Sequence, residues 1–305
     1  MNYVLRNWSF DPFLIVVGVV VIWHEVGLAN LRRRSRPERT RARRRHSLLF
    51  YAGLAVLLLA VVSPIDYWAD DYFFVHMIEH ILIMFFAPIL IVAGAPWLPL
   101  VHGLPVGARR RVGRALLLSS WAGPLRVLGR FVSNGIVAVA LFNTAMVIWH
   151  LPALFDLAER NQAVHIWLMH SSFFLTGVLF WLQIIPSYPI KPKLTTVRAI
   201  WAVLFTNVVM IILAMSLSIL SSGSWYVVYD HLSGIRLSPF ADQQIGAAIL
   251  WVCGDFWAYP ALVILIGRAI REEGSGSALI ERMLGRQAPF SFEETPSPDK
   301  APRIG

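Results

Sequence analysis

The chain has 305 residues, of which 57% are hydrophobic and only 15% charged, and its mean hydropathy is +0.60. So few charged residues cannot cover a water-soluble globule, which excludes a soluble protein and predicts a polytopic membrane protein. The formal net charge of +9 comes from short basic blocks between apolar runs, a pattern typical of cytoplasmic membrane flanks and not of nucleic-acid binding. The single cysteine, Cys253, excludes an internal disulfide and a CxxC metal or redox site.

Seven apolar runs are long enough to cross a hydrocarbon core of about 30 Å, which takes about 20 residues. In chain order they lie near residues 12–31, 46–64, 73–93, 131–150, 164–186, 197–220 and 245–267. The first run is predicted to be a retained span and not a signal peptide, because Arg32, Arg33 and Arg34 follow it instead of preceding it. We therefore predict an all-α bundle of seven transmembrane helices in one membrane domain, residues 1–267. A polar, partly disordered tail, residues 268–305, is expected to follow it.

The basic residues are distributed very unevenly between the predicted loops. Nine lie in loop 32–45, six in loop 94–130, three in loop 187–198 and six after residue 267, whereas Arg6, Arg160 and Arg236 lie in the alternate loops. Cytoplasmic loops carry the excess of Lys and Arg in membrane proteins. The N-terminus is therefore predicted to lie outside, and the C-terminus, with the tail, in the cytoplasm.

Five of the nine histidines fall near the predicted outer face, on three different helices. His76 and His80 lie in the first turns of the third span, His150 ends the fourth, and His165 and His170 begin the fifth. The first two are four residues apart and point the same way on a helix, so both can reach one ion. Ionisable side chains within a bilayer are costly unless they are paired or ligated. One such histidine alone is typical of an interfacial residue, but the joint pattern predicts a metal or haem site.

The neighbouring residues indicate which metal this site would take. Met146 lies one turn before His150, and Met169 adjoins His170, so thioether ligands accompany the imidazoles. Imidazole and thioether without a thiolate cluster suit copper, particularly Cu(I), better than magnesium or calcium, while zinc and iron stay open. The sequence therefore predicts a copper site.

Two further residues are predicted at the mouth of this site. His165 is five residues from His170 and faces elsewhere on an ideal helix, and Asp242 precedes the seventh span, where its carboxylate either attracts cations or caps the helix. The full set of predicted metal-binding residues is His76, His80, His150, His170, His165 and Asp242. Glu79 shares an arc with His76 and is predicted to orient an imidazole of the site by accepting a hydrogen bond from it.

At these residues the sequence resembles a known family. The stretch His76-Met77-Ile78-Glu79-His80, with Met84, Ala87-Pro88 and Gly94-Ala95-Pro96 after it, resembles the HMxxHxxLM…AP…GAP signature of the CtaG family. The resemblance continues through Trp149-His150-Leu151-Pro152, His170 and Asp242-Gln243-Gln244, and it covers about residues 50–270. Several motifs in the same order are far more specific than one alone. The sequence departs from the pattern at Ala247 and Asp255, and neither departure touches a histidine of the site.

Members of the CtaG family are membrane assembly factors of haem-copper cytochrome c oxidase. The resemblance therefore implies a metallochaperone that delivers copper to the copper-B centre of the catalytic subunit. It also implies a multi-pass protein of the bacterial plasma membrane, whose partners are that catalytic subunit, membrane lipid and other copper donors, but not nucleic acid. Handing over an ion breaks no covalent bond, so neither catalytic residues nor enzyme activity are expected.

Three other functions stay open on the sequence. Two facing histidines such as His80 and His170 would ligate a b-type haem in a membrane electron carrier. A metal-dependent hydrolase would use Glu79 as general base, although no matching serine motif is apparent. A copper transporter would need ligands along its whole path, and the inner half offers few beyond His24 and Glu25.

The predicted orientation is testable with topology reporters. Loops 64–72 and 151–163 should be extracytoplasmic, and loop 32–45 cytoplasmic, because the arginines gather in the last of these. Paired reporter fusions at Asp70 and Arg39 are expected to give opposite signals. Matching signals from the two positions would contradict the topology.

Overall fold

The computed structural model of the protein describes residues 7–8, 13–33, 36–232, 237–273, 280–281 and 283–284. Within these ranges the regular elements are all helices, and extended backbone pairs only at an isolated bridge between Ser187 and Ile190. The prediction of an all-α chain is therefore confirmed for the described residues.

Six helical segments of this part of the chain are long and apolar enough to cross a membrane. They are α1 (Phe13–Arg32), α2 (Pro37–Val62), the run α4–η1–α5 (Phe73–Ile81, Leu82–Phe86, Ala87–Gly94), the run α11–η3–α12 (Gln162–Val164, His165–His170, Ser171–Ile184), α13 (Thr196–Ser218) and α14 (Pro239–Glu273). A bent pair of helices supplies a seventh crossing if it counts as one span. The predicted polytopic architecture is thereby confirmed.

The fourth predicted span, 131–150, differs most from expectation. Two helical segments stand in its place, η2 with α8 (Ser120–Ala122, Gly123–Val132) and α9 (Gly135–Trp149), and they are bent by 80°. At the bend, the side-chain oxygen of Asn134 accepts hydrogen bonds from the backbone nitrogens of Ile136 and Val137 and so begins a new helix. At about 1.5 Å per residue, the 15 residues of α9 reach only about 22 Å, which makes this crossing short.

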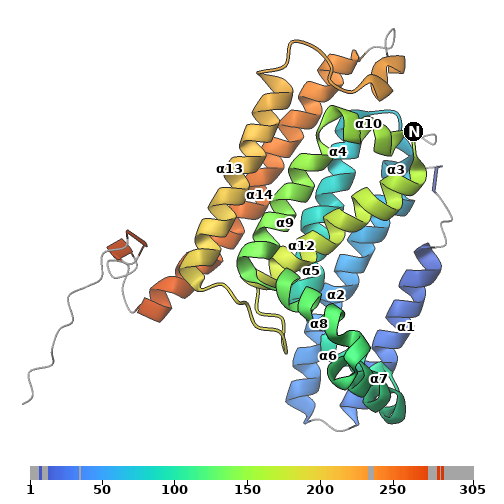
Figure 1. Ribbon diagram of the computed structural model, residues 1–305, viewed down its shortest axis with the longest axis vertical. Coiled ribbons are helices and arrows are strands. Elements are labelled where there is room, and N and C mark those ends of the chain that lie inside the picture. Colours follow the sequence, from blue (N-terminus) through green and yellow to red (C-terminus); the bar gives the residue numbers. More distant parts are fainter. Residues whose placement is uncertain are drawn as a thin grey trace, which may run out of the picture.

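Shorter helices connect the spans at the two ends of the bundle. They are α3 (Pro64–Ala69), α10 (Pro152–Glu159), η4 (Val227–Leu232), α6 (Trp97–Gly103) and α7 (Val106–Leu118). Figure 1 shows α3 and α10 at the end opposite α6, α7 and α8, so the basic residues of loop 94–130 gather away from α3 and α10. This segregation agrees with the charge pattern of the sequence. The orientation across the membrane stays a prediction, and Arg6 and Arg236 lie outside the described residues.

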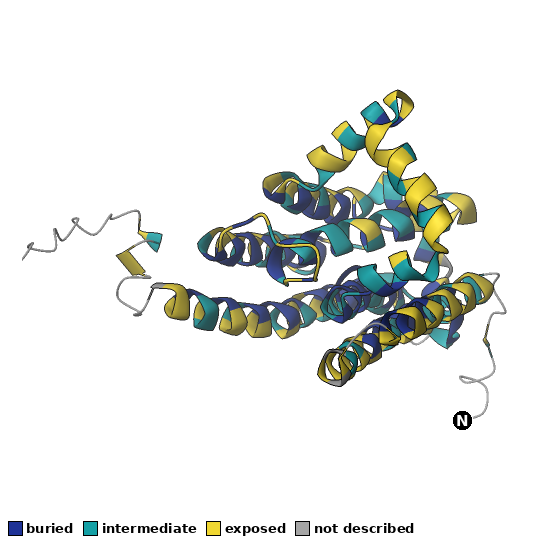
Figure 2. Cartoon of the chain, turned by 90° about the horizontal axis from the view of Figure 1, so that it is seen from below, coloured by how far each residue is buried: buried dark blue, intermediate teal, exposed yellow. Residues whose placement is uncertain are grey.

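The outward faces of the spans are apolar. Large exposed side chains on α1, α13 and α14 include Ile15, Ile22, Phe205, Ile212, Phe256 and Ile264. Figure 2 shows exposed residues along the outer sides of these helices and buried residues towards the inside of the bundle. Such continuous apolar faces are unusual on soluble proteins but suit contact with lipid.

The run α4–η1–α5 lies at the centre of the bundle. In its most apolar stretch 67% of the residues are buried, compared with 28–39% in the corresponding stretches of the other five spans. α14 packs against α4, α2 packs along α5, and α12 packs against both α5 and α9. The helix that carries the first two histidines of the predicted site is therefore the one that the other spans surround.

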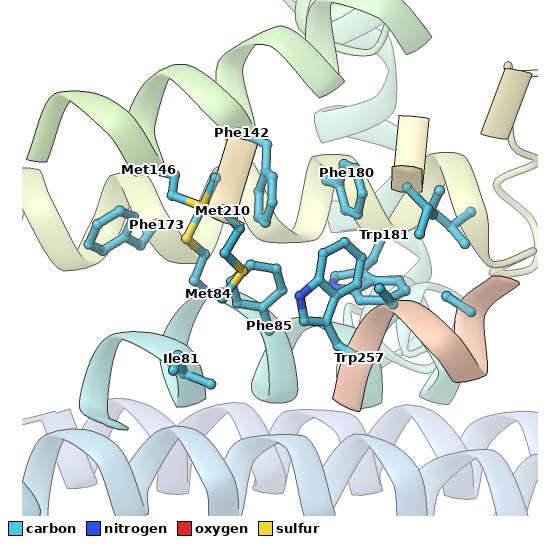
Figure 3. Packing of buried hydrophobic residues seen from close by; sticks show 14 of the residues in the cluster. Ile81, Met84, Phe85, Phe142, Met146, Phe173, Phe180, Trp181, Met210 and Trp257 are labelled. Atoms are coloured by element: carbon cyan, nitrogen blue, oxygen red, sulfur yellow. The ribbon is translucent and has the colours of Figure 1, made fainter. Parts of the chain in front are cut away.

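Aromatic rings fill the core between η1, α9, α12 and α14. Phe142 stacks on Phe180 with ring centroids 4.5 Å apart, and Trp257 lies 4.9 Å from Phe85 (Figure 3). Aromatic side chains bury large apolar areas, so this cluster contributes much of the packing between the central and outer spans.

The last span is longer than predicted. α14 continues past residue 267, the predicted end of the membrane domain, and ends at Glu273. Arg268 and Glu272 form an ion pair at 2.8 Å with the i,i+4 spacing that favours helix extension. Most of the predicted tail lies outside the described residues.

Gly177 of α12 permits the close approach of η1. A Cβ atom there would lie 2.4 Å from the backbone oxygen of Met84, whereas one at Gly18 of α1 would meet no atom within 4 Å. Gly177→Ala is therefore expected to destabilise the protein by about 1–3 kcal/mol through overpacking, measured as a lower melting temperature in detergent. Gly18→Ala is the matched control and should not lower the melting temperature. Equal values for the two variants would contradict this packing.

Candidate metal centre

Five histidines meet close to the beginning of α4. They come from α4 (His76 and His80), from η3 (His165 and His170) and from the C-terminal end of α9 (His150). The ring centroids of His76 and His80 lie 3.9 Å apart, and those of His80 and His170 5.6 Å. His150 lies 6.4 Å from His80 by the same measure, and all five residues are at most 8% exposed. The structure thus brings together the four histidines predicted to share a site.

His165 joins them because of a π-helical turn. On an ideal α-helix His165 would face away from His170, as expected from the sequence. Residues His165–His170 instead form the π-helix η3, whose i→i+5 pattern brings residues five apart to the same side. Their ring centroids lie 4.2 Å apart, so the expectation that His165 faces away from His170 is wrong. A second π-helix, η1, directly follows His80 and Ile81, and such turns are frequent at functional sites.

Hydrogen bonds orient two of the imidazoles. Nδ1 of His150 donates to the backbone oxygen of Met146 at 2.6 Å, so its Nε2 keeps the lone pair. The hydroxyl of Tyr229 donates to the backbone oxygen of Ala69 at 3.0 Å and lies 3.3 Å from Nδ1 of His76. Because the hydroxyl has a single proton, it accepts from Nδ1 of His76, whose Nε2 also keeps its lone pair. Histidines that ligate metals are commonly held in this way.

A buried carboxyl group of α4 faces the fifth span. Glu79 is fully buried, and its Oε1 lies 3.5 Å from Nε2 of His170. From the sequence we expected Glu79 to lie beside His76, because the two residues are three positions apart on one helix. The structure gives it a contact on a different helix, which local spacing does not reveal.

A second buried carboxyl was missed by sequence reasoning. Glu159 of α10 places its Oε1 3.6 Å from Nδ1 of His76 and 3.7 Å from Nε2 of His165. Burial, with Asp70 and Asp156 nearby, raises the pKa of the Glu159 carboxyl to about 8, so it is largely protonated at neutral pH. The available signal was its position in a short loop between two segments that both carry histidines.

Many polar atoms of this cluster have no hydrogen-bond partner within the described part of the chain. They are Nε2 of His76, His150, His165 and His170, both nitrogens of His80, both oxygens of Glu79 and Oε1 of Glu159. Each buried polar group left without a partner costs about 1–3 kcal/mol. Native interiors contain few buried polar groups without a hydrogen-bond partner, and here nine such atoms lie together in the five-histidine cluster. Their lone pairs fit a bound cation.

Two overlapping sets of residues are arranged to hold an ion. The first is His76, His80 and His165, and the second is Glu79, His165 and His170; in each set the ligand atoms lie within 4.8 Å of one another. Three imidazoles, or two imidazoles and a carboxylate, suit copper, zinc or iron. The donor chemistry is therefore compatible with the predicted copper site.

The thioether expected beside His150 lies in the hydrophobic core. Met146 packs in the same core cluster as Met84, Met210 and Phe142 (Figure 3). Imidazole and carboxyl groups are therefore the donors that the structure gathers at the centre of the site.

Asp242 belongs to neither donor set. Its two carboxylate oxygens accept hydrogen bonds from the backbone nitrogens of Phe73, at 2.8 Å, and Phe74, at 3.0 Å. The neighbouring Gln243 accepts from the backbone nitrogen of Trp225 at 2.7 Å. The sequence left two roles open for Asp242, cation attraction and helix capping. The structure shows that Asp242 caps a helix, and that this helix is α4 and not α14, to which Asp242 belongs. Both oxygens are engaged there, which does not support a metal-binding role.

Comparison with known proteins identifies relatives of the chain. The family described as cytochrome c oxidase caa3 assembly factor matches residues 22–272. Uncharacterized proteins of Mycobacterium bovis and Mycobacterium tuberculosis are each 29% identical to the chain over 276 residues, and one of Mycobacterium leprae is 24% identical over 272. These matches cover 87–88% of this chain but 40% of each relative, so the chain spans less than half of their length. No solved structure matches the chain.

The capping role of Asp242 can be separated from metal binding. Asp242→Ala leaves the backbone nitrogens of Phe73 and Phe74 without their acceptor, which should destabilise the protein by about 1–3 kcal/mol. We expect a lower melting temperature but an unchanged amount of copper bound at temperatures where the variant is folded. Ser238→Ala, which removes a hydrogen bond to the backbone nitrogen of Ala241 in an exposed setting, is the control. Loss of copper without loss of stability would instead make Asp242 a ligand.

Proposed function

Because the chain belongs to the cytochrome c oxidase caa3 assembly factor family, we propose that it binds copper at the five-histidine cluster and delivers it to the copper-B centre of the oxidase's catalytic subunit. The observation that carries this proposal is the group of buried imidazole nitrogens, from three helices, that have no hydrogen-bond partner in the described residues. Copper is the cargo, taken as Cu(I), and the catalytic subunit is the partner that receives it. Other copper donors would supply it.

The position of the cluster supports transfer within the membrane. At about 1.5 Å per residue, His80 lies roughly 10 Å beyond the start of α4. The copper-B centre is itself built from histidines inside the membrane, so donor and acceptor would hold the ion at similar depth. Moving an ion between two such sites avoids exposing its charge to hydrocarbon, which is costly. Incoming imidazoles can then replace those of the donor one at a time.

The packing of the cluster favours an ion over a haem. His80 and His170 are the pair that would ligate a haem, and their ring centroids lie 5.6 Å apart. His165 packs on His170 at 4.2 Å, and Phe173 packs on His80 at 4.7 Å, so side chains occupy the space around this pair. A haem macrocycle would need a slot between its two axial ligands. Ion transfer breaks no covalent bond, and we propose no enzymatic activity.

The cellular location of the protein follows from the same proposal. The chain is a multi-pass membrane protein by the length and apolar character of its helices. We place it in the bacterial plasma membrane, where an oxidase would be assembled, with lipid around its spans.

Removal of one imidazole tests the donor role. Cells that carry His80→Ala or His170→Ala are expected to make the protein at normal levels, because alanine is a good helix former and is cheap to bury. Their oxidase should be low in copper at the copper-B centre while retaining its haem, measured as copper per haem in the purified enzyme. Excess copper in the medium is expected to restore part of the loss, since a chaperone changes the rate of loading and not its end point.

His102→Ala is the matched control for these variants. His102 lies in α6, where its Nδ1 is 2.9 Å from the backbone oxygen of Leu98, and it takes no part in the cluster. Its variant should give an oxidase with full copper. Full copper in the oxidase from His80→Ala cells, with the variant protein present by immunoblot, would contradict the donor role.

A further inference from the structure

The two donor sets share one residue, and this overlap suggests how copper moves through the site. We propose that the cluster holds one copper ion in two alternative positions, and that the ion passes between them while His165 stays bound. The outer position uses His76, His80 and His165, and the inner position uses Glu79, His165 and His170. The inference rests on the proposed function and adds to it an internal transfer step and a role for Glu79.

The two positions differ in depth. α4 and the run from α11 to η3 both enter the bundle from the end that carries α3 and α10, so later residues in each lie deeper. On α4, His76 lies one turn in, and Glu79 and His80 are neighbours about one further turn along. His170 lies one π-helical turn beyond His165. The set that contains His76 therefore reaches nearest to this end of the bundle and is called the outer one, and the set that contains Glu79 and His170 is called the inner one.

His165 is suited to remain bound in both positions. Its ring centroid lies 5.2 Å from that of His76 in the outer set and 4.2 Å from that of His170 in the inner set. His165 lies between His76 and His170 because the π-helix η3 turns its side chain towards His170. An ion that keeps one ligand during transfer is never fully released into the apolar interior.

The overlap also argues against two ions bound at once. A neutral imidazole has one nitrogen lone pair, since its other nitrogen carries a proton, and so it ligates one ion at a time. Two cations a few ångströms apart would also repel each other strongly where the dielectric constant is low. The sets are therefore alternatives for a single ion.

The exchange of ligands is balanced. In the outer position the ion is held by three imidazoles. When the ion moves inward, its bonds to His76 and His80 are broken and bonds to Glu79 and His170 are formed, while the bond to His165 is kept. The copper keeps its oxidation state, so the step needs neither oxidant nor reductant. Because ligand bonds are replaced one for one, the barrier between the positions is kept low.

Anaerobic loading of the purified full chain with Cu(I) in detergent tests the two positions. Copper per chain is measured by metal analysis, and the copper ligands are measured by X-ray absorption. The unchanged protein should bind one copper ion. Glu79→Gln keeps the size of the side chain but ligates poorly, so it removes the inner position and leaves the outer one intact.

We expect Glu79→Gln to retain one copper ion held by three imidazoles and to lose the carboxylate oxygen that the unchanged protein shows among its copper ligands, since the inner position is removed. His76→Ala should retain copper with a carboxylate oxygen among its ligands. His165→Ala, which belongs to both sets, should lose copper altogether. Melting temperatures of the metal-free variants check that each is folded.

Three results would overturn the inference. Loss of copper from Glu79→Gln as complete as from His165→Ala would indicate one undivided site. Two copper ions in the unchanged protein would show that the sets are filled together. Copper ligands in Glu79→Gln identical to those in the unchanged protein would show that the inner position is not used. Failure of the proposed function is distinguishable from all three, because the unchanged protein would then bind no copper at all.

Discussion

The cost of burying polar groups in an apolar bundle is the constraint on which this structure depends. Elsewhere in the spans some such groups find nearby partners: Asn143 donates to Thr206 at 3.0 Å, and Nδ1 of His24 lies 2.7 Å from the hydroxyl of Tyr51. The five-histidine cluster is different, because six of its imidazole nitrogens and three oxygens of Glu79 and Glu159 gather in one place without a hydrogen-bond partner in the described chain. Natural proteins accept such local destabilisation where function needs it.

Segments far apart in the sequence hold the three histidine-bearing helices in place. Asp242 at the start of α14 caps α4, and so sets the position of His76. In η4, the hydroxyl of Tyr229 forms a hydrogen bond with Nδ1 of His76. Tyr226, the residue before η4, donates a hydrogen bond to the backbone oxygen of His150 at 3.0 Å. Asp242 and these two tyrosines therefore support the site from a distance. Segments at this end of the bundle thus hold the candidate metal centre in place, although they supply few of its donors.

Several features of the protein follow from the sequence because they depend on local properties of the chain. The length of each apolar run predicts a span, and the i,i+4 spacing of His76 and His80 predicts that they share a face. The position of His150 and His170 at the outer ends of two other spans then predicts their convergence. None of these inferences needs a contact between distant residues. The family resemblance rests on the same motifs and agrees with the family match over residues 22–272.

Tertiary structure alone decided the rest. His165 faces the cluster because η3 adopts a π-turn, which is less favourable than an α-turn in isolation and is stabilised by packing against neighbouring helices. Glu159 and Glu79 contact histidines on other helices, and Asp242 caps a helix 169 residues away. The sequence by itself determined which residues are polar within each span. Which of them face one another was decided by the crossing of the helices, because a distance between two helices is not a property of either one.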